Sequence, residues 1–166
     1  MKPKAPSIYV RNIIFGVEDS LVSTVGFLSG LAFVGMPEKT LVLTGLIYIF
    51  VEGFSMAMGS FLSEESTEEY ETGKEVPMTL PILGALAMLA SSIAAGFVPI
   101  APYLFLSERE GVIGSIIASL FALGALGYAH AKISGLPALP RIFRMVLLGG
   151  AAIVIGLIVG RVFGVA

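Results

Sequence analysis

The sequence predicts an all-α, polytopic membrane protein with five transmembrane helices. Of its 166 residues, 56% are hydrophobic and 13% are charged, and the mean hydropathy is +0.94. These values lie far from those of soluble domains. The apolar residues also fall into runs of about 20, the length at which a helix crosses a bilayer core of about 30 Å. We therefore expect residues 1–166 to form a single transmembrane domain without a folded soluble domain.

Short connections rich in Gly, Pro or charge separate the five expected spans. The first span, 9–34, should end before Pro37, because proline cannot continue a helix. The second, 40–62, should begin with Thr40 as a helix cap and lead into an acidic segment, 63–76. The region around Pro99 should close the third. The last three spans are expected over residues 81–100, 111–133 and 141–165.

The distribution of Lys and Arg predicts the orientation, because short connections rich in these residues stay in the cytoplasm. With the N-terminus inside, seven basic residues are cytoplasmic and three are outside. The seven are Lys2, Lys4, Arg11, Lys74, Lys132, Arg141 and Arg144, and the three are Lys39, Arg109 and Arg161. We expect the N-terminus and segment 63–76 in the cytoplasm, and the C-terminus outside or in a lumen.

Acidic residues inside two of the expected spans mark the expected functional site. An ionised carboxylate at membrane depth costs about 2.5–3.5 kcal/mol on insertion scales, so such residues usually face a cavity, a partner or a transported ion. At 1.5 Å per residue, Asp19 and Glu52 both lie about 15 Å from the cytoplasmic side. We expect their helices to run side by side and build a cation path. Glu18 points about 100° away from Asp19, which disfavours the shared-proton dyad of an intramembrane hydrolase.

Met56 follows Glu52 by four residues and therefore lies on the same helix face. Oxygen ligands alone suit magnesium, calcium and manganese, whereas a sulfur ligand shifts the preference toward later first-row metals. Asp19, Glu52 and Met56 are the candidate metal ligands within the membrane. The alternative that Met56 is apolar filler, the usual role of methionine in a membrane helix, stays open.

The acidic segment 63–76 carries six glutamates and one lysine. Four of the glutamates fall at i, i+4, i+7 and i+11, one face of a helix that would continue the second span. Like charges at this spacing repel each other, and bound divalent cations would offset the repulsion. These candidate metal ligands are Glu64, Glu68, Glu71 and Glu75. The alternative is a solvated acidic face without a ligand. For His130 we expect an interfacial role, since no partner ligand can be named.

Two motifs resemble the vacuolar iron transporter family. Phe15 and Gly16, then Asp19-Ser20-Leu21-Val22-Ser23, with Gly26 and Gly30 beyond, resemble its first-helix signature Gly-x-x-Asp-Gly-Leu-Val. Ser55-Met56-Ala57-Met58-Gly59 resembles its second-helix Ser-Met-Ala-x-Gly. The resemblance implies a homodimeric proton antiporter, not an enzyme, that moves ferrous iron, manganese and related divalent metals out of the cytosol. It also implies metal ligation by Asp19 and Met56. We expect Fe²⁺ or Mn²⁺ as substrate, no cofactor and no nucleic-acid partner.

The sequence departs from that family at several positions. Ser20 replaces the usual Gly, Ser60 stands where many members have Glu, and Glu52 stands where small residues are common. Segment 63–76 is too short for the multi-helix metal-binding domain of plant members, so metal capture there must be simpler. The rival interpretation is a non-transporting structural or regulatory membrane subunit, in which Asp19 and Glu52 only bond to neighbouring helices.

A homodimer is also expected from the size of the chain. One five-helix protomer is too small to surround Asp19. Gly26 and Gly30 lie four residues apart on one helix face, where they would let a second helix approach closely. We therefore expect these glycines at the contact between protomers.

Overall fold

The computed structural model describes residues 5–75 and 77–164. It contains five helices: α1 (Ala5–Phe33), α2 (Glu38–Thr72), α3 (Thr79–Phe105), α4 (Glu108–Ser134) and α5 (Ala138–Phe163). Each of them is long and apolar enough to cross a membrane. The prediction of an all-α, five-span membrane protein is confirmed.

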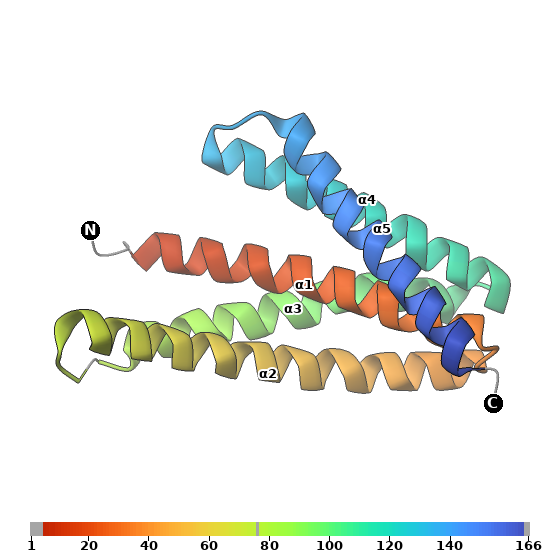
Figure 1. The fold of residues 1–166 in the computed structure, drawn as a ribbon, viewed down its shortest axis with the longest axis horizontal. Coiled ribbons are helices and arrows are strands. Elements are labelled where there is room, and N and C mark those ends of the chain that lie inside the picture. The colour runs from red at the N-terminus through yellow and green to blue at the C-terminus, as the bar shows by residue number, and fades with distance from the viewer. Residues whose placement is uncertain (1–4, 76, 165–166) are drawn as a thin grey trace.

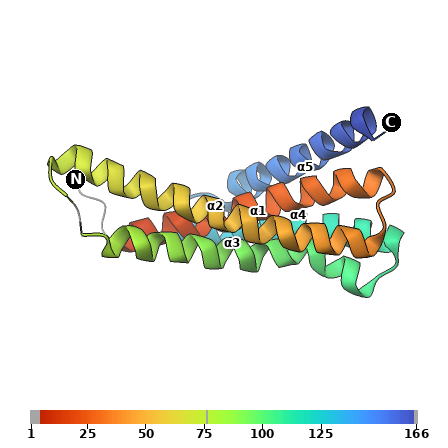
Figure 2. The same ribbon diagram turned by 90° about the horizontal axis from the view of Figure 1, so that it is seen from below.

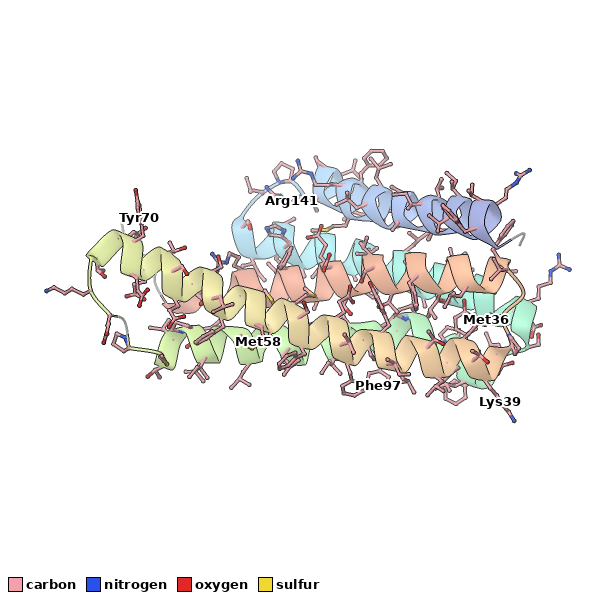
Figure 3. The ribbon with its side chains drawn as sticks, turned by 60° about the horizontal axis from the view of Figure 1, so that its bottom comes forward. Met36, Lys39, Met58, Tyr70, Phe97 and Arg141 are labelled. Atoms are coloured by element: carbon pink, nitrogen blue, oxygen red, sulfur yellow. The ribbon has the colours of Figure 1, made fainter. Side chains whose placement is uncertain are left out.

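Successive helices alternate in direction, so the bundle has two ends (Figure 1). The start of α1, the α2–α3 connection and the α4–α5 connection lie at one end. We call this the acidic end, because the glutamates of residues 64–75 lie there. The other two connections and the end of α5 lie at the opposite end. In Figure 3, Tyr70 and Arg141 lie toward the acidic end, whereas Met36 and Lys39 lie at the opposite end.

Helix α1 is the centre of the bundle, since it contacts all four other helices. Helices α2 and α3 run side by side along it (Figure 2). Helices α4 and α5 form a hairpin, and α5 crosses α1 obliquely on its way to the opposite end (Figure 1). The helix with the candidate Asp19 is therefore the one most enclosed by neighbours.

Polar side chains gather inside the bundle, and large apolar side chains cover its outside. Six serine and threonine residues of the described chain are buried: Ser20, Thr24, Ser29, Ser92, Ser115 and Ser119. Phe54, Phe121 and Leu147 are among the exposed apolar residues. This distribution suits a hydrocarbon solvent, because lipid tails solvate apolar side chains well but provide no hydrogen bonds to hydroxyl groups.

The third span is longer than predicted, because Pro99 and Pro102 lie inside α3 instead of ending it. A proline removes one backbone hydrogen bond, but neighbouring groups can compensate inside a membrane bundle. Here the buried Ser115 hydroxyl of α4 donates a hydrogen bond of 2.7 Å to the Pro99 carbonyl. The expectation that Pro99 ends the helix is therefore wrong. The hydrogen bond from Ser115 joins the proline-containing part of α3 to α4.

The second span is also longer than its apolar run. It begins at Glu38, directly after Pro37, so Thr40 is not its cap. The predicted continuation into the acidic segment is confirmed as far as Thr72. Gly73 ends the helix in the left-handed conformation, at φ 63°, and its N–H donates to the Glu69 carbonyl at 2.8 Å. Glu75 lies beyond this end, so it does not share the helical face of the other three glutamates.

Helices α1 and α5 touch backbone to backbone through glycines. A Cβ atom built on Gly26 would lie 2.8 Å from the Ala152 carbonyl oxygen, and one on Gly30 would lie 2.7 Å from that of Gly156. Gly156 and Gly160 of α5 in turn face Gly26 and Gly30. The close-contact face of Gly26 and Gly30, which we expected between protomers, thus lies against α5 of the same chain. The small residues are used within one chain, where they let α5 lie directly on α1.

We expect Gly156→Ala to lower the unfolding temperature in detergent, because its methyl group would collide with the Gly26 backbone, which cannot swing away. Overpacking of this kind typically costs about 1–3 kcal/mol. Gly150→Ala is the matched control, because no atom lies within 4 Å of its built Cβ. Equal unfolding temperatures for the two variants would show that α1 and α5 do not approach this closely.

Candidate functional site

Asp19 of α1 and Glu52 of α2 lie within electrostatic range of each other. Both side chains are half-buried, and Asp19 is also within this range of Tyr48. The Tyr48 hydroxyl donates a 2.8 Å hydrogen bond to Oε1 of Glu52. Oε2 of Glu52 is buried and has no hydrogen-bond partner within the described part of the chain. One carboxylate oxygen of Glu52 is therefore left without a protein partner there.

Aromatic stacking fixes the position of Tyr48. Its ring lies on that of Phe27 from α1, with centroids 4.5 Å apart and planes inclined by 15°. Such an arrangement is favourable beyond the area that it buries. Because the stack joins α1 to α2 beside Glu52, it orients the hydroxyl that holds this carboxylate.

Met56 lies on the same half-buried row of α2 as Glu52. Residues four apart stack along a helix, and six residues of this row are all half-buried: Tyr48, Glu52, Met56, Ser60, Glu64 and Glu68. The row carries oxygen and sulfur groups from the middle of the bundle to the acidic end. Met58 is exposed on another side of the helix (Figure 3). The two methionines therefore lie on different faces of α2.

Glu18 has different neighbours from the other acids. It lies within electrostatic range of His130 and Arg144 of the α4–α5 hairpin and also of the adjacent Asp19. In that hairpin, Nε2 of His130 is 3.5 Å from Nη1 of Arg141. Glu18 is therefore close to basic groups of α4 and α5.

Glu64 joins three helices at the acidic end. Its Oε1 accepts hydrogen bonds from Nη2 of Arg11 at 2.7 Å, from Nδ2 of Asn12 at 2.7 Å and from the Ser60 hydroxyl at 3.3 Å. Its Oε2 lies against Gly84 of α3, where an added Cβ would be 2.8 Å from this oxygen. We call this arrangement the Glu64 knot: Arg11, Asn12, Ser60, Glu64 and Gly84.

A pocket of about 230 Å³ opens beside the Glu64 knot. Glu64, Glu68, Glu71 and Arg11 are among its lining residues. Three of the four predicted glutamates therefore share one pocket, and Glu75 is not among them. No three acidic or histidine side chains lie close enough together to enclose a metal ion in residues 5–75 and 77–164.

The partners of Glu64 lie outside the set of residues predicted from the sequence. Asn12 is only 1% exposed, and an amide inside an apolar run is a signal in the sequence, because buried polar groups require partners. Arg11 indicates only orientation in the sequence. Gly84 gives no sequence signal, because the side chains that approach it come from α1 and α2.

A second hollow, of about 550 Å³, runs between α1 and α5. Its lining is mainly apolar and includes Val22, Phe27, Ile155 and Phe163. Ser23, which lies next to both Tyr48 and Glu52, belongs to the same lining. The groups in the middle of the bundle are thus adjacent to an apolar surface groove.

The fold and the site define a multi-pass membrane protein with carboxylates between its first two helices. The chain belongs to the VIT family, which matches residues 10–78 and 70–161. It is 29% identical to the vacuolar iron transporter homolog 3 of Arabidopsis thaliana, over 86% of this chain and 76% of that protein. Its identity to homolog 4 of the same plant is 28%, over 86% and 77%. Its identity to the vacuolar iron transporter 1 of Tulipa gesneriana is 20%, over 76% and 75%.

These comparisons confirm the resemblance that the first two helices indicated. They also extend it, because the matched residues reach from α1 into α5. Membership of the family makes the chain an integral, multi-pass membrane protein.

Proposed function

We propose that the protein moves divalent metal ions, Fe²⁺ or Mn²⁺, out of the cytosol in exchange for protons. The observation that carries the proposal is the pairing of Asp19 and Glu52 in the middle of a membrane bundle of the VIT family. Ionisable side chains at this depth are costly and are usually kept for an ion path. The names of the relatives, which are iron transporters or their homologues, support iron as one substrate.

In this mechanism the path follows the half-buried row of α2. Glu68 and Glu71 attract cations at the acidic end, which we place in the cytoplasm from the Lys and Arg distribution. Asp19, Glu52 and Met56 then bind the ion in the middle of the membrane, with oxygen and sulfur ligands that suit first-row divalent metals. A proton competes with the metal for the same carboxylates, so metal binding rises with pH, and this competition couples the two ions.

The rival function is a structural or regulatory subunit without transport. In that case the carboxylates only stabilise helix contacts, as the Tyr48–Glu52 hydrogen bond does. Metal uptake by proteoliposomes that contain the purified protein separates the two, because only a transporter accumulates Fe²⁺ or Mn²⁺ inside. Uptake no faster than that of empty liposomes would reject the transport proposal.

We expect Asp19→Asn to abolish metal uptake, because it keeps the shape of the side chain but removes the charge that attracts the ion. Glu52→Gln should reduce uptake less if Glu52 carries the proton. A loss of about 1.4 kcal/mol already lowers metal affinity tenfold. Glu110→Gln is a matched control, since its carboxylate is exposed at the opposite end. Wild-type uptake by a folded Asp19→Asn protein would make this carboxylate structural.

The Met56→Leu variant should change the ranking of metals more than the fold, because it removes the sulfur while nearly keeping volume. Uptake of softer ions should fall most relative to that of Mn²⁺. Met58→Leu is the control, because Met58 lies on the same helix but is 40% exposed. An unchanged ranking in Met56→Leu would favour the interpretation of Met56 as apolar filler.

The glutamates at the acidic end should raise apparent metal affinity without being essential. Replacement of Glu64, Glu68, Glu71 and Glu75 by Gln should weaken Mn²⁺ binding in calorimetry and raise KM for uptake, while the path through the membrane remains. Glu65→Gln with Glu69→Gln is the control in the same segment, because neither residue lines the pocket. Equal binding by all variants would support a solvated acidic face.

We also propose a homodimer, in which a second copy completes the metal site. Two observations support it: no three metal-binding side chains of one described chain enclose an ion, and the groove between α1 and α5 passes Ser23, next to Glu52. Native mass spectrometry in mild detergent and in lipid discs should show two chains per particle. Val159→Ser, in the groove wall, should weaken the dimer, whereas Val154→Ser outside the groove should not. A monomer under both conditions contradicts this proposal.

A further inference from the structure

In the Glu64 knot, other groups of the protein cover the carboxylate of Glu64. The side chain of Glu64 is only 9% exposed, whereas that of its ion-pair partner Arg11 is 63% exposed. All three donors converge on Oε1, whereas Oε2 is buried against the Gly84 backbone without a hydrogen-bond partner among the described residues. Oε1 is therefore occupied by protein donors, although Glu64 lines the pocket with Glu68 and Glu71.

We propose that Arg11 is a tethered cation that occupies Glu64 in place of a metal ion and thereby selects divalent over monovalent cations at the acidic end. This proposal rests on the transport function proposed above. It adds a specificity-determining residue on α1 to the glutamates of α2. An ion from the pocket reaches Glu64 only by displacing the guanidinium group.

The selection follows from charge. Arg11 carries one positive charge and already lies 2.7 Å from Oε1, so K⁺ or Na⁺ gains no electrostatic advantage over it. A divalent ion attracts the same carboxylate twice as strongly at equal distance. It also gains the attraction of Glu68 and Glu71, which line the same pocket. A divalent ion can therefore replace Arg11 where a monovalent ion cannot.

The exposure of Arg11 makes the exchange physically accessible. The Arg11 side chain already lies mostly in water, so its release from the carboxylate requires little rearrangement. Asn12 is buried and stays hydrogen-bonded to Glu64, so the carboxylate keeps one partner during the exchange. Exposed ion pairs are weak, and loss of this one should raise apparent metal affinity about two- to fivefold.

The test compares Mn²⁺ uptake by wild type, Arg11→Gln and Arg11→Lys in proteoliposomes, at low and at high K⁺. Arg11→Gln should lower KM for Mn²⁺ and should make uptake sensitive to K⁺. Arg11→Lys keeps a tethered cation and should restore wild-type behaviour. Lys74→Gln is the matched control, because it removes an exposed positive charge from the same end without touching Glu64. Arg11→Met, which keeps the aliphatic stem, replaces Arg11→Gln if that variant does not fold.

Three results would overturn the proposal. An unchanged or raised KM in the neutral Arg11 variant would make Arg11 a purely structural clamp. An equal shift in Lys74→Gln would assign the effect to overall charge. The same KM in Arg11→Lys as in Arg11→Gln would show that a tethered cation does not compete. If wild type itself takes up no metal, the transport function fails as well, whereas each of the other results leaves it intact.

Discussion

The structure depends on one constraint: a carboxylate at membrane depth must be covered by other protein groups. Helix α1 carries Glu18 and Asp19 in its apolar run, and it is the helix that contacts all the others. Glu18 lies near basic groups of the α4–α5 hairpin, and Asp19 lies within electrostatic range of Glu52 on α2. Hydrocarbon offers no hydrogen bonds, so the helix whose membrane-spanning part has the lowest hydropathy takes the most enclosed position.

Close packing around α1 is achieved by different means on its two sides. Toward α5, glycines on both helices let the backbones touch, which excludes lipid without requiring side chains to interlock. Toward α2 and α3, polar side chains join the helices, at Tyr48–Glu52 in the middle and at the Glu64 knot near the end. The glycine contact sets the position of α5 on α1, whereas the polar contacts lie along the proposed ion path.

Helix α2 connects the two proposed metal-binding regions. One continuous helix of 35 residues is longer than a bilayer core requires, so its half-buried row runs from the membrane centre to the glutamates outside the apolar run. An ion leaving the acidic pocket would meet groups of the same helix throughout.

The sequence by itself determined the five spans and the helical continuation of α2, because hydropathy and periodicity are local properties. Only the tertiary structure decided which groups cover them. Pro99 lies inside α3, where its carbonyl accepts a hydrogen bond from Ser115 of another helix. Gly26 and Gly30 pack against α5 of the same chain. Glu64 belongs to Arg11 and Asn12, 53 and 52 residues away. These partners are distant in the chain, and a single sequence contains periodicity but no distances between helices.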